Sequence, residues 1–278
     1  MKQQLIDFLT RISFIHNYFS GIATIFMLHR VAPFEEGKLI PNENMKVSPQ
    51  FLESFIVTLK KSGYTFISLD ELYEILNKQK KVKKCVLFTL DDGYKDNHEI
   101  AYPLFKSYNV PFTIYITTSF INKNTILWWY ALEDLIIENE YIEIKGGFYE
   151  CMSFEEKNKT FMKIRQKILN LNQKNLLNEL NTLFKNYDID WYKYNGILCL
   201  NWNQITEFSK DPLCTIGGHT VNHLAFSVLN EEEILKEILE ANKELESKIN
   251  KKIEHFAYPF GGPNEVRKEH MDIVSKLN

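Results

Sequence analysis

The sequence predicts an α/β fold built on a parallel sheet, either open or closed into a barrel. Short apolar segments rich in β-branched residues alternate along the chain with segments of helical periodicity. The apolar segments lie at 21–28, 64–69, 84–90 and 110–118, and the helical segments at 48–63, 69–79 and 96–108. Strands that alternate with helices at this spacing are typical of parallel sheets.

The composition is that of an ordinary globular protein. The chain has 278 residues, 45% hydrophobic residues and a net charge of -3, which suits one large domain or two small ones. A near-neutral balance gives no reason to expect nucleic-acid binding. The four cysteines form no C-x-x-C pair, so we expect core residues in a reducing compartment rather than a disulfide frame or a zinc cluster.

Residues 1–20 are expected to form an N-terminal helix docked on a main domain of residues 21–278. Asp7 and Arg11 interrupt the apolar run of this helix, and no small-x-small cleavage site follows, which argues against a signal peptide. No stretch approaches the length of a membrane span. These features predict a cytoplasmic protein, with peripheral contact between the helix and a membrane surface as an alternative.

Local signals mark where the first helices begin. Ser48 precedes Pro49, which is the usual pairing of an N-cap with a first helical residue. Ser68 and Glu71 have the spacing of a capping box for the next helix. Pro103 lies inside the third helical segment and predicts a kink there.

The alternation breaks between 127 and 210, where we expect a mainly helical insertion into the domain. The insertion opens on Trp128-Trp129 and contains a polar helical run at 154–186. The earlier pattern then resumes, with predicted strands at 213–217 and 254–258 and predicted helices at 231–250 and 264–277.

Two adjacent carboxylates, Asp91 and Asp92, directly follow the apolar strand at 84–90. Gly93 then permits a sharp turn away from the sheet. Two charges at the end of an apolar strand are costly to desolvate unless a partner such as a cation pairs with them. Adjacent acids also occur at surface turns, so the motif needs further ligands before it indicates a site.

Two histidines, His219 and His223, follow the strand at 213–217 after a Gly-Gly pair. Residues four apart face the same way on a helix, which suits metal ligation, although a purely structural role is the alternative. One carboxylate and two imidazoles would leave open coordination positions, as catalytic metal sites do. Zn²⁺ is the default ion, and Co²⁺, Ni²⁺ or Fe²⁺ fit the same ligands. The second carboxylate could then act as a base on bound water, but the spacing does not settle which acid has which role.

A third motif, Tyr258-Pro259-Phe260-Gly261, closes the predicted strand at 254–258. With Phe88 to Gly93 and His219-Thr220-x-x-His223, in the same order, it resembles the NodB-type polysaccharide deacetylases, carbohydrate esterase family 4. The resemblance covers about residues 22–275. The segment Met27 to Val31 is also similar to the first strand of a subgroup that acts on bacterial exopolysaccharides and surface glycans.

This resemblance implies a distorted (β/α) barrel of the polysaccharide-deacetylase type that binds one divalent metal, usually zinc. It also implies removal of acetyl groups from N-acetylated sugars of a bacterial polysaccharide or its precursor. Asp91 would be the catalytic base, and Asp92, His219 and His223 would be the metal ligands. The backbone N–H of Phe260 would help to bind the oxyanion.

Further residues take supporting roles through the same resemblance. Ala257 stands where many family members carry an arginine that pairs with the catalytic aspartate, and His29 could fill part of that space. Tyr258 belongs to the same substrate-side motif as Phe260, and Trp128 could roof a groove for the sugar chain. Thr220 would support the histidine loop by hydrogen bonding.

The family continues after the third motif with further strands, the last of which brings a Leu-x-x-His whose histidine is the general acid. Here His270 lies within the final predicted helix, so that role is not transferred to it. We therefore expect a barrel that lacks its last strand or strands. The alternative function is a truncated, weakly active or inactive deacetylase-like protein that binds metal and glycan. A metal-dependent sugar transferase would leave the two histidines without a role.

Overall fold

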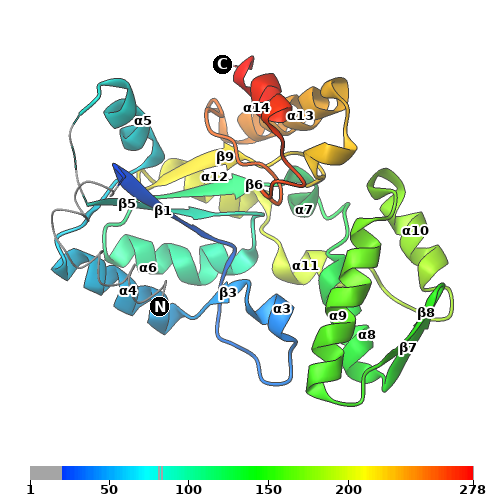
Figure 1. Cartoon of the computed structure of the whole chain (residues 1–278). Helices are drawn as coiled ribbons and strands as arrows, with labels where there is room; N and C mark the ends of the chain where they lie inside the picture. The colour runs from blue at the N-terminus through cyan, green and yellow to red at the C-terminus, as the bar shows by residue number, and fades with distance from the viewer. Residues whose placement is uncertain (1–20, 81, 83, 278) are drawn as a thin grey trace, which may run out of the picture.

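The protein is built on a parallel sheet that lies between layers of helices (Figure 1). The computed structural model describes residues 21–80, 82 and 84–277. The strands run in the order β1-β5-β6-β9, and β4 pairs with β5. Their bounds are β1 Ala23–Leu28, β4 Thr65–Phe66, β5 Cys85–Leu90, β6 Phe112–Ile116 and β9 Cys214–Gly218. All these pairings are parallel, as predicted, and in the described part of the chain the sheet does not close into a ring.

The central strand β5 divides its side chains between two cores. Val86, Phe88 and Leu90 pack in one cluster with residues of the helices α4 (Pro49–Lys61) and α6 (Tyr102–Ser107). Cys85 and Leu87 pack on the opposite face with α5 (Leu69–Asn77). A parallel strand that is covered on both faces is mostly apolar, which explains the nearly continuous apolar run that predicts β5.

The predicted helix starts are confirmed. The Ser48 hydroxyl accepts a hydrogen bond from the Phe51 N–H at 3.2 Å, and Ser68 and Glu71 form the reciprocal capping box of α5. The remaining elements around the sheet are the strand pair β2 (Arg30–Val31) and β3 (Lys46–Val47), and the helices α3 (Ile40–Glu43), α7 (Thr118–Ile121), η3 (Phe226–Val228), α13 (Glu231–Ile249) and α14 (Lys268–Ser275).

The predicted strand at 254–258 is not formed. A single parallel bridge joins Phe256 to Gly218 of β9. The segment makes only two backbone hydrogen bonds to Gly218, one to its N–H and one to its carbonyl, and so continues the sheet by one step. The predicted strand at 64–69 likewise shortens to β4, because Ser68 already caps the following helix.

The predicted helix at 96–108 is present but changes its winding. It begins as a π-helix, η1 (Asn97–Ala101), in which the Tyr102 N–H bonds to the Asn97 carbonyl, and it continues as α6. Pro103 lies in the first turn of α6, so its missing N–H falls at the junction between the two windings. The predicted kink therefore takes the form of a wide turn directly before the proline.

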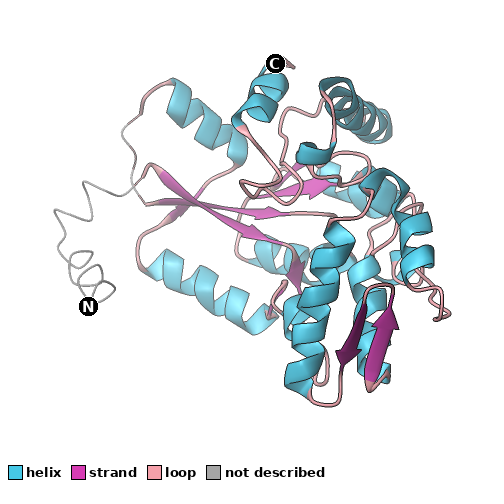
Figure 2. Ribbon diagram, turned by 45° about the vertical axis from the view of Figure 1, so that its right-hand side comes forward, coloured by secondary structure: helices cyan, strands magenta, loops and turns pink. Residues whose placement is uncertain are grey.

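The segment expected to be an insertion packs around a core of its own beside the sheet (Figures 1 and 2). Buried residues such as Leu132, Phe161 and Trp191 belong to this core. Its elements are α8 (Trp128–Glu138), a hairpin of β7 (Tyr141–Ile144) and β8 (Gly147–Glu150), α9 (Phe154–Leu169), η2 (Gln173–Asn175), α10 (Leu176–Leu183) and α11 (Asn195–Leu198). The last helix of the segment, α12 (Trp202–Lys210), instead packs into the core of the sheet. The boundaries at 127 and 210 stay a prediction.

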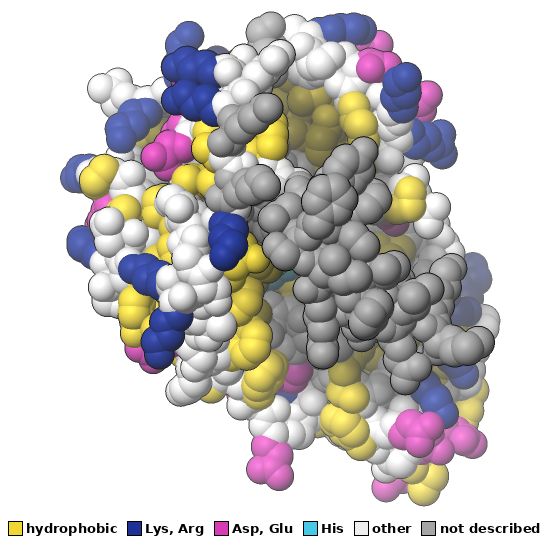
Figure 3. All heavy atoms as spheres, turned by 60° about the vertical axis from the view of Figure 1, so that its left-hand side comes forward, with side chains coloured by type: hydrophobic (Ala, Val, Ile, Leu, Met, Phe, Trp, Pro, Cys, Tyr) yellow, Lys and Arg dark blue, Asp and Glu magenta, His cyan; other side chains and the backbone are white. Residues whose placement is uncertain are grey.

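The surface carries a mixture of hydrophobic and charged side chains, as expected from the composition. On the face drawn in Figure 3, hydrophobic side chains lie among lysine, arginine and acidic side chains. No described helix has both the length and the apolarity needed to cross a membrane. All four cysteines are buried, as expected of core residues. The predicted N-terminal helix at 1–20 lies outside the described residues.

Candidate metal centre

The parallel sheet brings the first two motifs together at one edge. The strands β5 and β9 flank β6 and run in the same direction, so their carboxyl ends lie at the same edge of the sheet. Asp91 follows β5, and its N–H donates to the Leu28 carbonyl of β1 at 2.9 Å. His219 follows β9, and its N–H donates to the Ile116 carbonyl of β6 at 3.0 Å. Open parallel sheets place their sites at this edge.

Asp92, His219 and His223 form a compact cluster. The Asp92 Oδ1 atom lies 3.5 Å from the His219 Nε2 atom and 3.2 Å from the His223 Nε2 atom. One ligand atom from each residue lies within 4.8 Å of the others, and no second group of three such residues is found among the described residues. This carboxylate and these two imidazoles are the three candidate ligands predicted from the sequence.

The cluster fits a divalent cation. Asp92 is 3% exposed, yet its Oδ1 atom has no hydrogen-bond partner among the residues that the structure describes. The His219 Nδ1 atom lies 2.9 Å from the Ala257 carbonyl oxygen, which can only accept, so Nδ1 carries the proton. The Nε2 lone pair of His219 is then directed at the cluster, in the way that metal-binding histidines are oriented by a second hydrogen bond. These donors suit Zn²⁺.

The histidines of the cluster keep Asp92 in the ionised form that a metal ligand requires. Burial alone would raise the pKa of Asp92, but His223 and His219 more than offset it and hold the pKa well below its usual range. Burial would lower the pKa of His219, but Asp92 and then Asp91 raise it above its ordinary value. The site therefore keeps a buried carboxylate ionised between two imidazoles that stabilise its negative charge.

The two histidines are not on a helix, in contrast to the prediction. Residues 219–225 form an irregular loop between β9 and η3. Thr220 and His223 have left-handed backbone conformations, with φ of 67° and 56°. The Thr220 hydroxyl accepts from the His223 N–H at 3.0 Å, as the resemblance implied. The loop thus brings His223 back toward His219 until their ring centroids are 4.9 Å apart.

The glycines before His219 are needed for close packing. A Cβ atom on Gly217 would overlap the Tyr115 ring, and one on Gly218 would overlap the Asn242 amide. Strand β9 therefore approaches β6 and α13 more closely than a side chain would allow. This close packing places His219 directly beside the end of β6.

Asp91 lies beside the cluster but outside it. It is half-buried, and no residue in the described part of the chain forms a hydrogen bond with its Oδ1 atom. Burial raises the pKa of Asp91, and the Asp92 charge raises it further, against the attraction of His219, His29 and His223. A carboxylate held next to the ligands with an unpaired oxygen has the position required of a base.

Of the other predicted site residues, some lie close to the cluster and one does not. The Phe260 ring packs against the His223 ring at 4.7 Å, and Phe260 is 47% exposed. His29 lies near enough to Asp91 to lower its pKa. Tyr258 is not brought to the ligands by any described contact, and its ring packs instead with Phe226 and Phe256.

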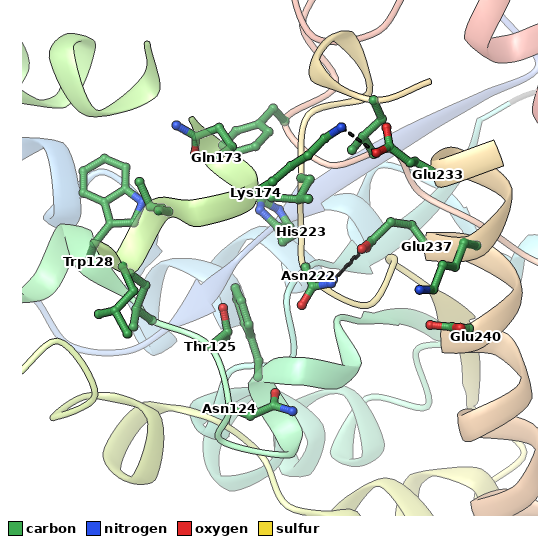
Figure 4. A pocket seen from close by; sticks show the side chains of 18 of the residues that line it. Asn124, Thr125, Trp128, Gln173, Lys174, Asn222, His223, Glu233, Glu237 and Glu240 are labelled. Atoms are coloured by element: carbon green, nitrogen blue, oxygen red, sulfur yellow. Dashed lines mark hydrogen bonds and ion pairs between the residues drawn. The ribbon is translucent and has the colours of Figure 1, made fainter. Parts of the chain in front are cut away.

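A pocket of about 480 Å³ opens beside His223 (Figure 4). Trp128 lines it and is only 6% exposed, so it forms part of a wall rather than the predicted roof. The facing wall is α13, which contributes Glu233, Glu237 and Glu240. Glu237 had no signal in the sequence, since nothing in a helix of regular periodicity marks one glutamate as the hydrogen-bond partner of a distant loop.

The chain is similar in sequence to known proteins. YxkH of Bacillus subtilis (strain 168) is 36% identical over 74 residues, 26% of each chain. A poly-beta-1,6-N-acetyl-D-glucosamine N-deacetylase of Staphylococcus aureus (strain MSSA476) is 31% identical over 109 residues, 39% of this chain and 36% of that protein. The aligned segments thus span about a quarter to a third of these relatives.

Solved structures share the fold over most of the chain. The deacetylase PplD of Streptococcus pyogenes, in complex with acetate, has a TM-score of 0.58 and 18% identity over 92% of this chain and 80% of that one. IcaB from Ammonifex degensii has a TM-score of 0.58 and 17% identity over 93% of this chain and 82% of that one. The likeness confirms the predicted deacetylase-type fold, present here as the open parallel sheet. The family model described as polysaccharide deacetylase matches residues 78–277, and the chain therefore belongs to the polysaccharide deacetylase family.

Proposed function

We propose that this chain is a metal-dependent hydrolase that removes acetyl groups from N-acetylated sugars of a bacterial polysaccharide or its precursor. The observation that carries the proposal is the cluster of Asp92, His219 and His223 with Asp91 beside it at the carboxyl edge of the sheet. The first three residues would hold one divalent ion, Zn²⁺ by preference, with Co²⁺, Ni²⁺ or Fe²⁺ as substitutes. Asp91 is then the remaining carboxylate at the site.

The residues divide the chemistry of amide hydrolysis between them. A bound divalent cation would polarise the acetyl carbonyl and lower the pKa of an attacking water. Asp91 would accept the proton of that water at its carboxylate. The backbone N–H of Phe260 would donate a hydrogen bond to the carbonyl oxygen as negative charge develops on it. His29, near Asp91, would stabilise the charge of the base. As the C–N bond breaks, Asp91 would return the proton of the water to the leaving nitrogen, so that the products are acetate and a free amine.

The pocket supports a sugar chain as the substrate. It joins aromatic side chains, such as Trp128 and Tyr192, to polar ones, such as Asn124 and Gln173, and it reaches His223. Aromatic faces and amide groups suit the apolar faces and the hydroxyl and acetamido groups of sugars. The Staphylococcus aureus relative is named for a β-1,6-linked N-acetylglucosamine polymer. Polymers of N-acetylglucosamine are therefore the first substrates to test.

The test is acetate release by the purified chain with added Zn²⁺, Co²⁺ or Ni²⁺. We expect acetate from oligosaccharides of N-acetylglucosamine, offered with β-1,4 and with β-1,6 linkages. An Asp91→Asn variant should release acetate at least ~10²-fold more slowly while it still binds metal. Binding of zinc and oligosaccharide without any acetate would instead support the alternative, a deacetylase-like protein that does not turn over. Reduced oligosaccharide affinity in Trp128→Ala would place the sugar in the pocket, and unchanged affinity would remove Trp128 from it.

A further inference from the structure

We propose that Glu237 of α13 is a positioning residue that holds the loop carrying His223 in its ligand conformation. The inference rests on the proposed function, because it assigns Glu237 a purpose in metal binding. Glu237 itself lies outside the candidate ligand cluster. It would act on the metal only through the loop.

One carboxylate accepts three hydrogen bonds from two consecutive loop residues. The Glu237 Oε2 atom accepts from the Val221 N–H at 3.1 Å and from the Asn222 N–H at 2.8 Å. Its Oε1 atom accepts from the Asn222 side-chain amide at 2.6 Å (Figure 4). Hydrogen bonds to an ionised acceptor are stronger than bonds between neutral groups. Glu237 therefore fixes both the backbone and a side chain of the loop.

The loop needs such an anchor because its backbone is strained. Thr220 and His223, on either side of the anchored pair, are non-glycine residues with left-handed φ angles. His219 is fixed independently by β6 and by the Ala257 carbonyl. Among the described residues, the backbone of His223 is hydrogen-bonded only to the Thr220 hydroxyl, which belongs to the same loop. The N–H groups of Thr118 and Ser119 in α7 hold the carbonyls of Thr220 and Val221, and Glu237 adds a second link, from the loop to the long helix α13.

The helix that carries Glu237 is a suitable support. Ile234, Ile238, Ala241 and Leu245 of α13 are buried, so the helix is fixed against the rest of the protein. Sites that are held by helices are placed more accurately than sites that depend on loops alone. A shift of Glu237 would be transmitted to His223 through two intervening residues.

Neighbouring glutamates on α13 do not share this role. Glu233 pairs with Lys174 of η2 at 2.5 Å and also caps its own helix through Asn230. Glu240 lines the same pocket, but its side chain makes no hydrogen bond or ion pair with any described residue. Glu240 is therefore a matched control, since it has the same charge, helix and pocket without a contact to the loop.

The experiment compares zinc affinity and loop exchange in four variants, each measured in the full chain. Affinity is obtained by competition with a chromophoric chelator, and the Co²⁺-loaded proteins are compared by visible absorption. We expect Glu237→Ala to weaken zinc binding by roughly 10–100-fold, as loss of an outer partner of a metal site does. Glu237→Gln should fall between it and the wild type, because its one amide oxygen still accepts. Asn222→Ala should lose less than Glu237→Ala, and Glu240→Ala should match the wild type.

Hydrogen exchange of the Val221 and Asn222 amides is followed in the metal-free proteins. We expect it to be at least ~10-fold faster in Glu237→Ala, with the exchange of the β-sheet amides unchanged. Wild-type zinc affinity and a wild-type Co²⁺ spectrum in folded Glu237→Ala would overturn the proposal, as would wild-type loop exchange. If the wild-type chain binds no zinc, the proposed function fails, and the exchange measurement alone then decides whether Glu237 positions the loop.

Discussion

Replacement of Asp92 by asparagine tests the candidate metal centre directly. Asparagine has nearly the same volume, so the buried position should stay filled. Its amide can donate to the Nε2 atom of His223, which lies 3.2 Å from the Asp92 Oδ1 atom. The fold should therefore persist, while the only carboxylate of the candidate cluster is lost. We expect the variant to remain folded and to lose most of its zinc affinity.

The size of the effect follows from linkage between binding and folding. At a free zinc concentration of about 100 times the dissociation constant, binding stabilises the wild-type protein by about 2.7 kcal/mol. Loss of a direct ligand should weaken binding at least as much as loss of an outer partner, so we take about 100-fold. At the same zinc concentration the variant would gain only about 0.4 kcal/mol. For a domain of this size these values correspond to rises in Tm of about 5–10 °C and about 1 °C.

The assay is thermal unfolding with excess zinc and with a chelator, together with the metal content of the dialysed proteins. Asp91→Asn is the control, because Asp91 lies next to the cluster without belonging to it. That variant should keep the zinc-induced rise in Tm and lose acetate release. An equal rise in Tm for the wild type and Asp92→Asn would refute the ligand assignment. Loss of the rise in Asp91→Asn alone would show that the two aspartates exchange roles.

Three further variants test other parts of the structure. Asp96→Ala should destabilise the protein by about 3–5 kcal/mol in urea unfolding, because it leaves Arg30, paired with Asp96 at 2.7 Å, as a buried charge; a loss below about 1 kcal/mol would contradict this. Burial would raise the pKa of Asp134, but hydrogen bonds from two lysines and a tyrosine lower this pKa below its ordinary value. The ionised Asp134 therefore stabilises the fold above the ordinary carboxyl pKa, and this stabilisation is lost as the pH falls through the lowered pKa. The difference in unfolding free energy between the wild type and Asp134→Asn should therefore be constant from about pH 5 to 7 and shrink below about pH 4, whereas a constant difference down to pH 2 would disprove the shift. Gly217→Ala should destabilise the fold by roughly 1–3 kcal/mol, since its Cβ atom would overlap the Tyr115 ring, and an unchanged Tm would show that the strands can separate at no cost.

The fold was predictable where one local pattern has one structural meaning. The apolar run at 84–90 gives β5 because only a strand covered on both faces needs so many consecutive apolar residues. The caps at Ser48 and Ser68 fixed two helix starts, because the side chain and the backbone N–H that it accepts from are neighbours in sequence. The segment at 254–258 was wrongly predicted to be a strand. Its extended pattern is real, but a strand also needs a partner, and here Gly218 alone provides one.

At the candidate site, the residue types were predictable from the sequence, but the backbone that places them was not. The spacing of His219 and His223 indicated a pair of ligands, and the pair does meet Asp92. The reason given was wrong, because four residues of helix are replaced by a loop with two left-handed residues. Several backbone paths can bring two side chains together, so spacing alone identifies ligands better than it identifies their support. The contact to Glu237 depends on that path and therefore had no signal in the sequence.

The two adjacent aspartates were the ambiguity that spacing could not resolve, and their backbone separates them. Asp91 still follows the sheet, since its N–H bonds to the carbonyl of Leu28 in β1. Asp92 has a φ of 77° and Gly93 a φ of 90°, so the chain turns at Asp92 itself. This turn carries the Asp92 carboxylate into the protein, where it is 3% exposed between two imidazoles, while Asp91 stays half-buried. If the roles were reversed, the ligand would be the acid that lies outside the cluster, and the base would be the one that water reaches least. The backbone thus favours Asp92 as the ligand and Asp91 as the base on physical grounds that are independent of the family resemblance.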